Sequence, residues 1–180
     1  MSITTVGIIG AGTMGNGIAQ ACAVSGIQVI MVDISEAAVG KGLSTVAGSL
    51  ERLLKKDKIS AADKDAALAR IKGSTSYDDL KAADLVIEAA TENHDLKVKI
   101  LKQIDAIVAP EVIIASNTSS ISITKLAAVT SRPDRFIGMH RMLAPIWPAL
   151  AITILTVGVN MVVDWLLSVE ARPSGAQAEM

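Results

Sequence analysis

A glycine-rich turn between two apolar strands is the feature that most constrains how this chain can fold. The chain has 180 residues, and residues 6–33 read VGIIGAGTMGNGIAQACAVSGIQVIMVD. An apolar strand ends at Ile9, a helix-forming segment follows the turn, and a second apolar strand ends beside Asp33. The turn itself is Gly10-Ala11-Gly12-Thr13-Met14-Gly15. This order predicts one complete βαβ unit whose turn binds a dinucleotide.

Each of three glycines has a physical reason to stand in such a turn. Gly10 allows the tight bend out of the strand, Gly12 lets the backbone approach a pyrophosphate, and Gly15 lets the helix pack closely on the sheet. The pyrophosphate would rest on the unpaired N–H groups at the helix N-terminus, where the macrodipole favours negative charge. Because glycine turns are common, this motif alone could also be purely structural.

Asp33 stands where a dinucleotide site needs an acid. It follows the glycines by about 20 residues, the spacing of the carboxylate that accepts hydrogen bonds from the adenosine ribose. A carboxylate there repels a 2′-phosphate, so the sequence predicts NAD rather than NADP. Taken alone, Asp33 could equally cap the helix that follows it. The strand, the turn, the helix and the acid together favour dinucleotide binding.

Composition excludes several other classes of function. The formal net charge of −1 and the aromatic content of 2% provide no basic surface and no stacking platform, so nucleic acid is not an expected partner. The single cysteine, Cys22, supplies neither a disulfide framework nor a metal site, which suits a reducing cytoplasm. The first strand begins soon after Met1, which leaves no room for a leader peptide.

Helical and strand patterns alternate through the rest of the first 140 residues. Helices are expected at about 36–56, 60–71, 95–109 and 123–129, although three glycines weaken the first and Gly73 should end the second. Strands are expected at 84–89, 112–115 and 136–139, with a short strand or turn over 74–80. The buried stripe of the helix 95–109 should comprise Leu96, Ile100, Leu101, Ile104 and Val108. The pattern predicts an α/β fold, a Rossmann-like doubly wound, mostly parallel sheet with helices on both faces.

Several polar side chains should meet at the carboxyl edge of this sheet, where open α/β sheets bind ligands. Besides Asp33, they are Glu92, Lys97, Asn117, Ser119 and His140. A histidine titrates near neutrality, so His140 could exchange the proton of an alcohol during hydride transfer. A histidine after a strand is often structural, and Asn117 and Ser119 could instead cap the following helix.

Five segments together resemble the NAD-binding domain of the L-3-hydroxyacyl-CoA dehydrogenases, especially the bacterial 3-hydroxybutyryl-CoA dehydrogenases. They are GAGTMGNGIAQ from Gly10, DLVIEAATEN from Asp84, LKVKILKQID from Leu96, ASNTSSISITKLA from Ala115 and RPDRFIGMH from Arg132. The resemblance runs continuously from about residue 3 to residue 140. It implies oxidation of a (3S)-3-hydroxyacyl-CoA to the 3-oxoacyl-CoA with NAD, or the reverse reduction, in fatty acid or butanoate metabolism.

The resemblance also assigns roles to individual residues. The glycine turn and Asp33 are implied to hold the ADP half of NAD, and Glu92 and Lys97 to contact the cofactor as well. Ser119 matches the serine that binds the substrate 3-oxygen beside the nicotinamide, and His140 matches the catalytic base. The positions that match contacts to the CoA moiety are Ser49 and Lys56.

The family pattern breaks after His140. Leu143 and Ile152 occupy the positions of an expected asparagine and of the glutamate that orients the histidine. The chain is therefore expected to consist of an NAD-binding domain, 1–140, and an atypical apolar tail, 141–180, in place of the helical C-terminal domain that forms the family's dimer. A non-catalytic NAD-binding module is the alternative function. Residues 142–163 carry no charge, so a membrane contact stays open, although a buried strand and a short helix are at least as consistent.

Overall fold

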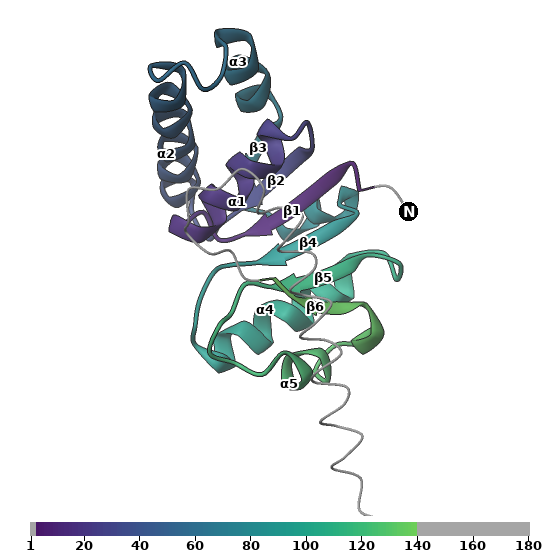
Figure 1. Cartoon of the computed structure of the whole chain (residues 1–180). Coiled ribbons are helices and arrows are strands. Elements are labelled where there is room, and N and C mark those ends of the chain that lie inside the picture. The colour runs from purple at the N-terminus through teal and green to yellow at the C-terminus, as the bar shows by residue number, and fades with distance from the viewer. Residues whose placement is uncertain (1–2, 140–180) are drawn as a thin grey trace, which may run out of the picture. The chain divides into compact units, whose positions relative to one another are not determined.

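Six strands form the sheet of the computed structural model, which describes residues 3–139 (Figure 1). They are β1 (Thr5–Ile9), β2 (Gln28–Val32), β3 (Ile71–Ser74), β4 (Leu85–Glu88), β5 (Ile113–Ser116) and β6 (Phe136–Gly138). Their order is β3-β2-β1-β4-β5-β6, and every pairing between neighbours is parallel. The chain therefore builds outward from β1 to β3 and then crosses to β4 on the other side of β1. The predicted Rossmann-like sheet is confirmed, with its switch point between β1 and β4.

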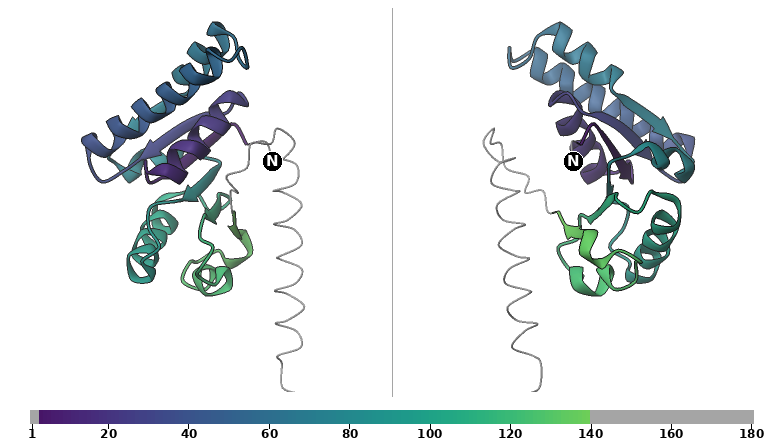
Figure 2. Two further views of the ribbon diagram at one scale, coloured as in Figure 1. Left: turned by 60° about the vertical axis from the view of Figure 1, so that its left-hand side comes forward. Right: turned by 90° about the vertical axis from the view of Figure 1, so that its right-hand side faces the viewer.

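Helices cover both faces of this sheet, as predicted (Figure 1, Figure 2). The α-helices are α1 (Thr13–Val24), α2 (Glu36–Leu54), α3 (Ala61–Ala69), α4 (His94–Ile107) and α5 (Ile123–Ala127). Two 3₁₀ helices complete the described residues, η1 (Tyr77–Ala82) and η2 (Pro133–Arg135). One hydrophobic cluster joins the sheet to α1, α2 and α3, and a second joins it to η1, α4 and α5.

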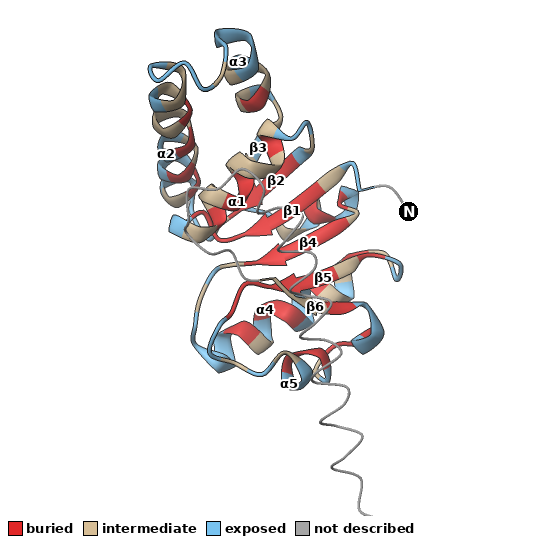
Figure 3. Ribbon diagram, in the orientation of Figure 1, coloured by how far each residue is buried: buried red, intermediate tan, exposed pale blue. Residues whose placement is uncertain are grey.

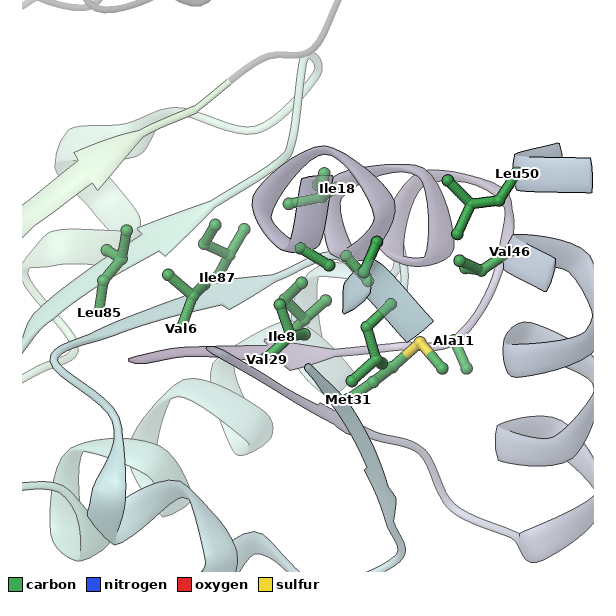
Figure 4. Close-up of a cluster of buried hydrophobic side chains, with 14 of the residues drawn as sticks. Val6, Ile8, Ala11, Ile18, Val29, Met31, Val46, Leu50, Leu85 and Ile87 are labelled. Carbon is green, nitrogen blue, oxygen red and sulfur yellow. The ribbon is translucent and has the colours of Figure 1, made fainter. Parts of the chain in front are cut away.

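The central strands are largely apolar because both of their faces are buried (Figure 3). Side chains along β1 and β2 alternate between the two clusters, as the two-residue period of a strand requires. Those that face α1 and α2 are Val6, Ile8, Val29 and Met31 (Figure 4). Those that face the opposite cluster are Ile9, Ile30 and Val32. This packing fixes the strand ends, and with them the loops at the carboxyl edge.

The helix predicted at 60–71 is shorter than expected. Ser60 caps α3 in a capping box with Asp63, but the helix ends at Ala69 and Ile71 begins β3. Gly73 therefore lies within a strand and does not end a helix. A Cβ atom at this position would collide with the Val39 side chain of α2, so the glycine lets α2 close on the sheet. The following segment forms η1 and not a strand.

The apolar stripe of α4 also differs from its prediction at one position. Ile100, Leu101, Ile104 and Val108 are buried, whereas Leu96 is 48% exposed. Lys97 takes the inward position at the start of the helix, with an exposed fraction of only 1%. The reason is electrostatic, because the Lys97 ammonium pairs with a buried carboxylate at the end of β4.

Candidate functional site

The glycine turn after β1 has a backbone that only glycine accommodates at its first position. Gly10 has a φ of +99°, in the left-handed region. A Cβ atom there would lie 2.7 Å from both the Ala89 carbonyl oxygen and the Ala90 Cα atom. The Gly10 amide donates to the Val32 carbonyl oxygen at 2.8 Å. The turn is thus fixed between the ends of β2 and β4.

The other two glycines have different surroundings. A Cβ atom at Gly15 would overlap the Gly10 carbonyl oxygen, so a side chain at this position would push α1 off the turn. A Cβ atom at Gly12, in contrast, would meet no atom within 4 Å. The absence of a side chain at Gly12 therefore leaves open space above the turn, where a pyrophosphate can approach the backbone.

Helix α1 is the exception among the five α-helices that the structure describes, because no side chain caps its N-terminus. Gly12 is its N-cap residue, and its first turn carries no acid. Side chains cap the other four, namely those of Ser35, Ser60, Asn93 and Ser122. The first amides of α1 thus have no side-chain acceptor, and their dipole favours an anion.

Asp33 lies directly beside this turn. Its Oδ2 atom accepts a hydrogen bond from the Ala11 amide at 2.6 Å, and its Oδ1 atom accepts one from the Ile34 amide at 2.7 Å. Helix α2 is capped by Ser35, whose Oγ atom accepts from the Ala38 amide at 3.2 Å. Asp33 is therefore not the helix cap that local sequence alone allowed.

Two residues near Asp33 were missed by sequence reasoning. Ile34 is 92% exposed, so an apolar side chain stands in solvent next to the carboxylate. Tyr77 is half-buried, and its burial together with the Asp33 and Glu88 carboxylates raises the pKa of its hydroxyl. The phenol consequently stays neutral at physiological pH. Exposure of an isoleucine cannot be read from a sequence, and Tyr77 lies in a polar segment without a motif.

Two loops meet at the carboxyl ends of β4 and β5. Glu92 follows β4, and its Oε2 atom accepts hydrogen bonds from Thr118 Oγ1 at 2.7 Å and from Ser120 Oγ at 2.8 Å. Ser119 stands between these two partners and is exposed. The structure thus brings the predicted residues Glu92 and Ser119 to the same edge.

The other interpretation of this loop, as the cap of the next helix, does not hold. Ser122 caps α5, and its Oγ atom accepts from the Lys125 amide at 3.4 Å. Asn117 is mostly buried, and its backbone N–H donates to the Glu88 carbonyl oxygen at 2.8 Å. Ser119 therefore has no structural capping role in α5.

Beneath these loops lies a buried ion pair. Lys97 Nζ pairs with Glu88 Oε2, and Ser116 Oγ donates to the same oxygen at 2.8 Å. The resemblance implies that Lys97 contacts the cofactor, whereas its ammonium here binds side chains of the interior. Glu88 and Ser116 were not predicted as site residues. The only feature of the sequence that could have indicated a role for Glu88 is its position as an acid in an otherwise apolar strand.

The remaining predicted residues lie elsewhere or outside the described range. Ser49 is half-buried in α2, and Lys56 is exposed just beyond the end of that helix. Helix α2 packs on α1 and α3. Ser49 and Lys56 thus belong to a different part of the chain from the loop that carries Ser119. His140 lies outside the described residues, as does the tail 141–180. The last described residue, Met139, donates its amide to the Ser116 carbonyl oxygen at 2.9 Å.

Two features of other protein classes are absent from residues 3–139. No group of three or more His, Cys, Asp or Glu side chains in this part of the chain is arranged to hold a metal ion. None of its helices combines the length and the apolar character that crossing a membrane requires. Cys22 lies half-buried in α1 against the first hydrophobic cluster.

Comparison with known proteins agrees with this geometry. Residues 5–150 match the family model described as "3-hydroxyacyl-CoA dehydrogenase, NAD binding domain". A 3-hydroxybutyryl-CoA dehydrogenase of Bradyrhizobium diazoefficiens is 48% identical over 140 residues, which are 78% of this chain and 48% of that protein.

Solved structures give the same result. The (S)-3-hydroxybutyryl-CoA dehydrogenase PaaH1 of Ralstonia eutropha is 79% identical with a TM-score of 0.77, over 78% of this chain and 50% of that one. FadB2 of M. tuberculosis is 38% identical with a TM-score of 0.78, over 79% of this chain and 50% of that one. The chain spans about half the length of these relatives. It belongs to the 3-hydroxyacyl-CoA dehydrogenase NAD-binding domain family, whose cofactor is NAD.

Proposed function

We propose that this chain binds NAD for the oxidation of a (3S)-3-hydroxyacyl-CoA to the 3-oxoacyl-CoA, or for the reverse reduction. The observation that carries the proposal is the uncapped N-terminus of α1, with open space at Gly12 and the Asp33 carboxylate alongside. These groups fit the two parts of a nucleotide diphosphate that most need recognition. First-turn amides suit the pyrophosphate, and a carboxylate suits the ribose hydroxyls.

The proposed site residues would bind different halves of NAD according to the strands that they follow. The glycine turn and Asp33 lie at β1 and β2, so they would hold the ADP half. The exposed Ile34 side chain would offer an apolar surface to the adenine ring. Glu92 and Ser119 follow β4 and β5 on the other side of the switch point, so they would face the nicotinamide half.

Two residues would act on the substrate. NAD, when bound, accepts a hydride from the carbon that carries the hydroxyl group. His140 would take the hydroxyl proton as a general base, because an imidazole exchanges protons near neutral pH. Ser119 would hydrogen-bond the 3-oxygen and so hold the reacting carbon in place. For the CoA moiety, Ser49 and Lys56 would supply a hydroxyl and a cation to phosphate groups, a role that rests on resemblance alone.

The sequence after His140 favours a weak enzyme or, alternatively, a non-catalytic NAD-binding module. Leu143 and Ile152 replace the asparagine and glutamate of the family pattern. An apolar residue at the glutamate position cannot orient the imidazole or stabilise its protonated form. In Ser-His-Asp enzymes the corresponding partnership contributes about 10⁴ in turnover. A cytoplasmic location stays a prediction from the single cysteine.

Steady-state NADH formation from (S)-3-hydroxybutyryl-CoA separates the two functions. We expect turnover about 100-fold or more below that of a full-length relative, because the histidine lacks its carboxylate partner. The residual activity should disappear in the His140→Gln and Ser119→Ala variants. Equal rates for wild type and His140→Gln, with NAD still bound, would establish the non-catalytic module instead. Turnover at the rate of a full-length relative would show that Leu143 and Ile152 do not impair catalysis.

A further inference from the structure

Three buried polar side chains from three elements meet below the loops that follow β4 and β5. Glu88 and Ser116 are fully buried, and Lys97 is 1% exposed. Glu88 Oε2 accepts from Lys97 Nζ and, at 2.8 Å, from Ser116 Oγ. Lys97 Nζ also donates to Ser116 Oγ at 3.3 Å. We call this cluster the Glu88–Lys97–Ser116 network.

The network joins the last residues of two neighbouring strands. Glu88 ends β4 and Ser116 ends β5, and the two are direct partners in the register of the sheet. Lys97 reaches both from the second turn of α4. Any change in the spacing of the three groups would therefore shift the loops that begin at the next residue of each strand.

The second carboxylate oxygen of Glu88 binds the backbone at the start of the β4 loop. Glu88 Oε1 accepts a hydrogen bond from the Ala90 amide at 3.0 Å. One carboxylate thus fixes the start of the β4 loop and, through Ser116, the end of β5.

Stability alone does not account for an ion pair in this interior. Removing two charges from water is expensive, and a well-packed apolar pair of similar volume is often as stable or more stable. What the ion pair provides, and apolar packing does not, is directional bonding among three elements. The loops it fixes carry Glu92 and Ser119. Glu92 also accepts hydrogen bonds from Thr118 and Ser120, the two neighbours of Ser119, so the two loops are bonded to each other.

We propose that the Glu88–Lys97–Ser116 network is a positioning device for the nicotinamide half of the cofactor. This inference rests on the proposed binding of NAD and adds two positioning residues, Glu88 and Ser116. The ADP half lies on the opposite side of the switch point and should not depend on the network.

Ligand affinities of network variants test this assignment. The double variant Glu88→Gln with Lys97→Met removes both charges together, so that no buried charge is left unpaired. Titration should compare NADH with ADP-ribose, which lacks the nicotinamide, and should follow the fluorescence of bound nicotinamide. We expect the double variant to bind NADH about tenfold more weakly and to lose the fluorescence change. Its affinity for ADP-ribose should stay within about twofold of wild type.

The single variants test whether the three residues act as one unit. If they do, Glu88→Gln and Lys97→Met should each weaken NADH binding, and the double variant should bind NADH no more weakly than the weaker-binding single variant. Ser116→Ala should have the same effect to a smaller degree. An effect of Lys97→Met without one of Glu88→Gln would show that Glu88 does not position the cofactor and would overturn the proposal.

A second buried ion pair provides a matched control. Arg132 Nε donates to Asp105 Oδ1 at 2.7 Å, and both side chains are largely buried near the C-terminal end of α4. Burial alone would raise the pKa of Asp105, but hydrogen bonds from Ser131 and Arg132 outweigh it and hold the pKa below its usual value. Asp105→Asn should lower stability without changing either ligand affinity.

Other results of these titrations would refute either the positioning role of the network or the proposed function. If network variants lose NADH and ADP-ribose affinity in parallel, or lose neither, the network is structural and the proposal fails. A wild-type chain that binds NADH no better than ADP-ribose would also contradict it. Failure of the wild-type chain to bind either ligand would instead refute the proposed function, so the two failures are distinguishable.

Discussion

At the scale of single residues, the side chains beside the glycine turn fit the proposed binding of NAD. Asp33 accepts two backbone amides next to an uncapped helix, although Ser35 already caps α2. Ile34 exposes 92% of its surface, whereas most large apolar side chains in the described residues are buried. In the proposed complex, an exposed isoleucine next to the Asp33 carboxylate would lose its contact with water when adenine packs on it.

Substitution of Ile34 tests this contact. Ile34→Ser should weaken NAD binding about fivefold, because partial burial of one apolar side chain contributes roughly 1 kcal/mol. Ile34→Leu should retain the wild-type affinity, and nicotinamide mononucleotide, which lacks adenine, should bind both variants equally. Calorimetric titration measures all of these affinities.

The chain offers a matched control for that substitution. Ile3 is also exposed, at 40%, but it precedes β1 and so lies at the amino edge of the sheet. Ile3→Ser makes the same chemical change away from the proposed site and should leave NAD affinity unaltered. Equal losses from Ile3→Ser and Ile34→Ser would exclude an adenine contact.

At the scale of elements, close packing of α2 against the glycine turn explains an unusual helix. Three glycines weaken the prediction of a helix over 36–56, yet α2 extends over Glu36–Leu54. Gly42 is where α2 passes over the turn, since a Cβ atom there would lie 2.8 Å from the Ala11 Cβ atom. At Gly40 nothing lies within 4 Å of such an atom. Packing thus requires a glycine at position 42 and does not require one at position 40.

Alanine substitutions at these two glycines should have opposite effects. Gly40→Ala should stabilise the protein by about 0.5–1 kcal/mol, because alanine favours helix and restricts the unfolded chain. Gly42→Ala should destabilise it by about 1–3 kcal/mol through overpacking. It should also weaken NAD binding, because a displaced Ala11 moves the amide that holds Asp33. Urea unfolding and NAD titration measure both effects, and stabilisation by Gly42→Ala would contradict the packing argument.

Sequence patterns predicted most elements because long apolar runs and glycine turns are local signals. They failed where the deciding contact is distant in the chain. Ile71 continues the apolar pattern of α3 but pairs with Val29 in β2, a contact that no local pattern contains. Lys97 was predicted among the polar side chains at the carboxyl edge, but its partners Glu88 and Ser116 are brought next to it only by the fold. The glycine turn and Asp33 were predictable, whereas the network required the fold.

At the scale of the whole molecule, the strand order places the residues proposed for the two halves of NAD on opposite sides of the switch point. The glycine turn stands at the switch point between β1 and β4, with β2 and β3 on one side and β5 and β6 on the other. The ADP half of NAD would lie toward β2, and the nicotinamide half toward β5. Since the chain spans about half the length of its relatives, the complete reaction is a proposal, and cofactor binding is the claim on which it depends.

Calorimetric titration of the wild-type chain and of Asp33→Ala with NAD and NADP tests that claim most directly. The wild-type chain should bind NAD and prefer it to NADP, because the Asp33 carboxylate would accept hydrogen bonds from the ribose hydroxyls and would repel a 2′-phosphate. Asp33→Ala should lose about tenfold or more in NAD affinity and most of that preference. The exposed Asp65→Ala variant on α3 should match wild type. No binding of NAD by the wild-type chain at millimolar concentration, or unchanged binding by Asp33→Ala, would contradict the account.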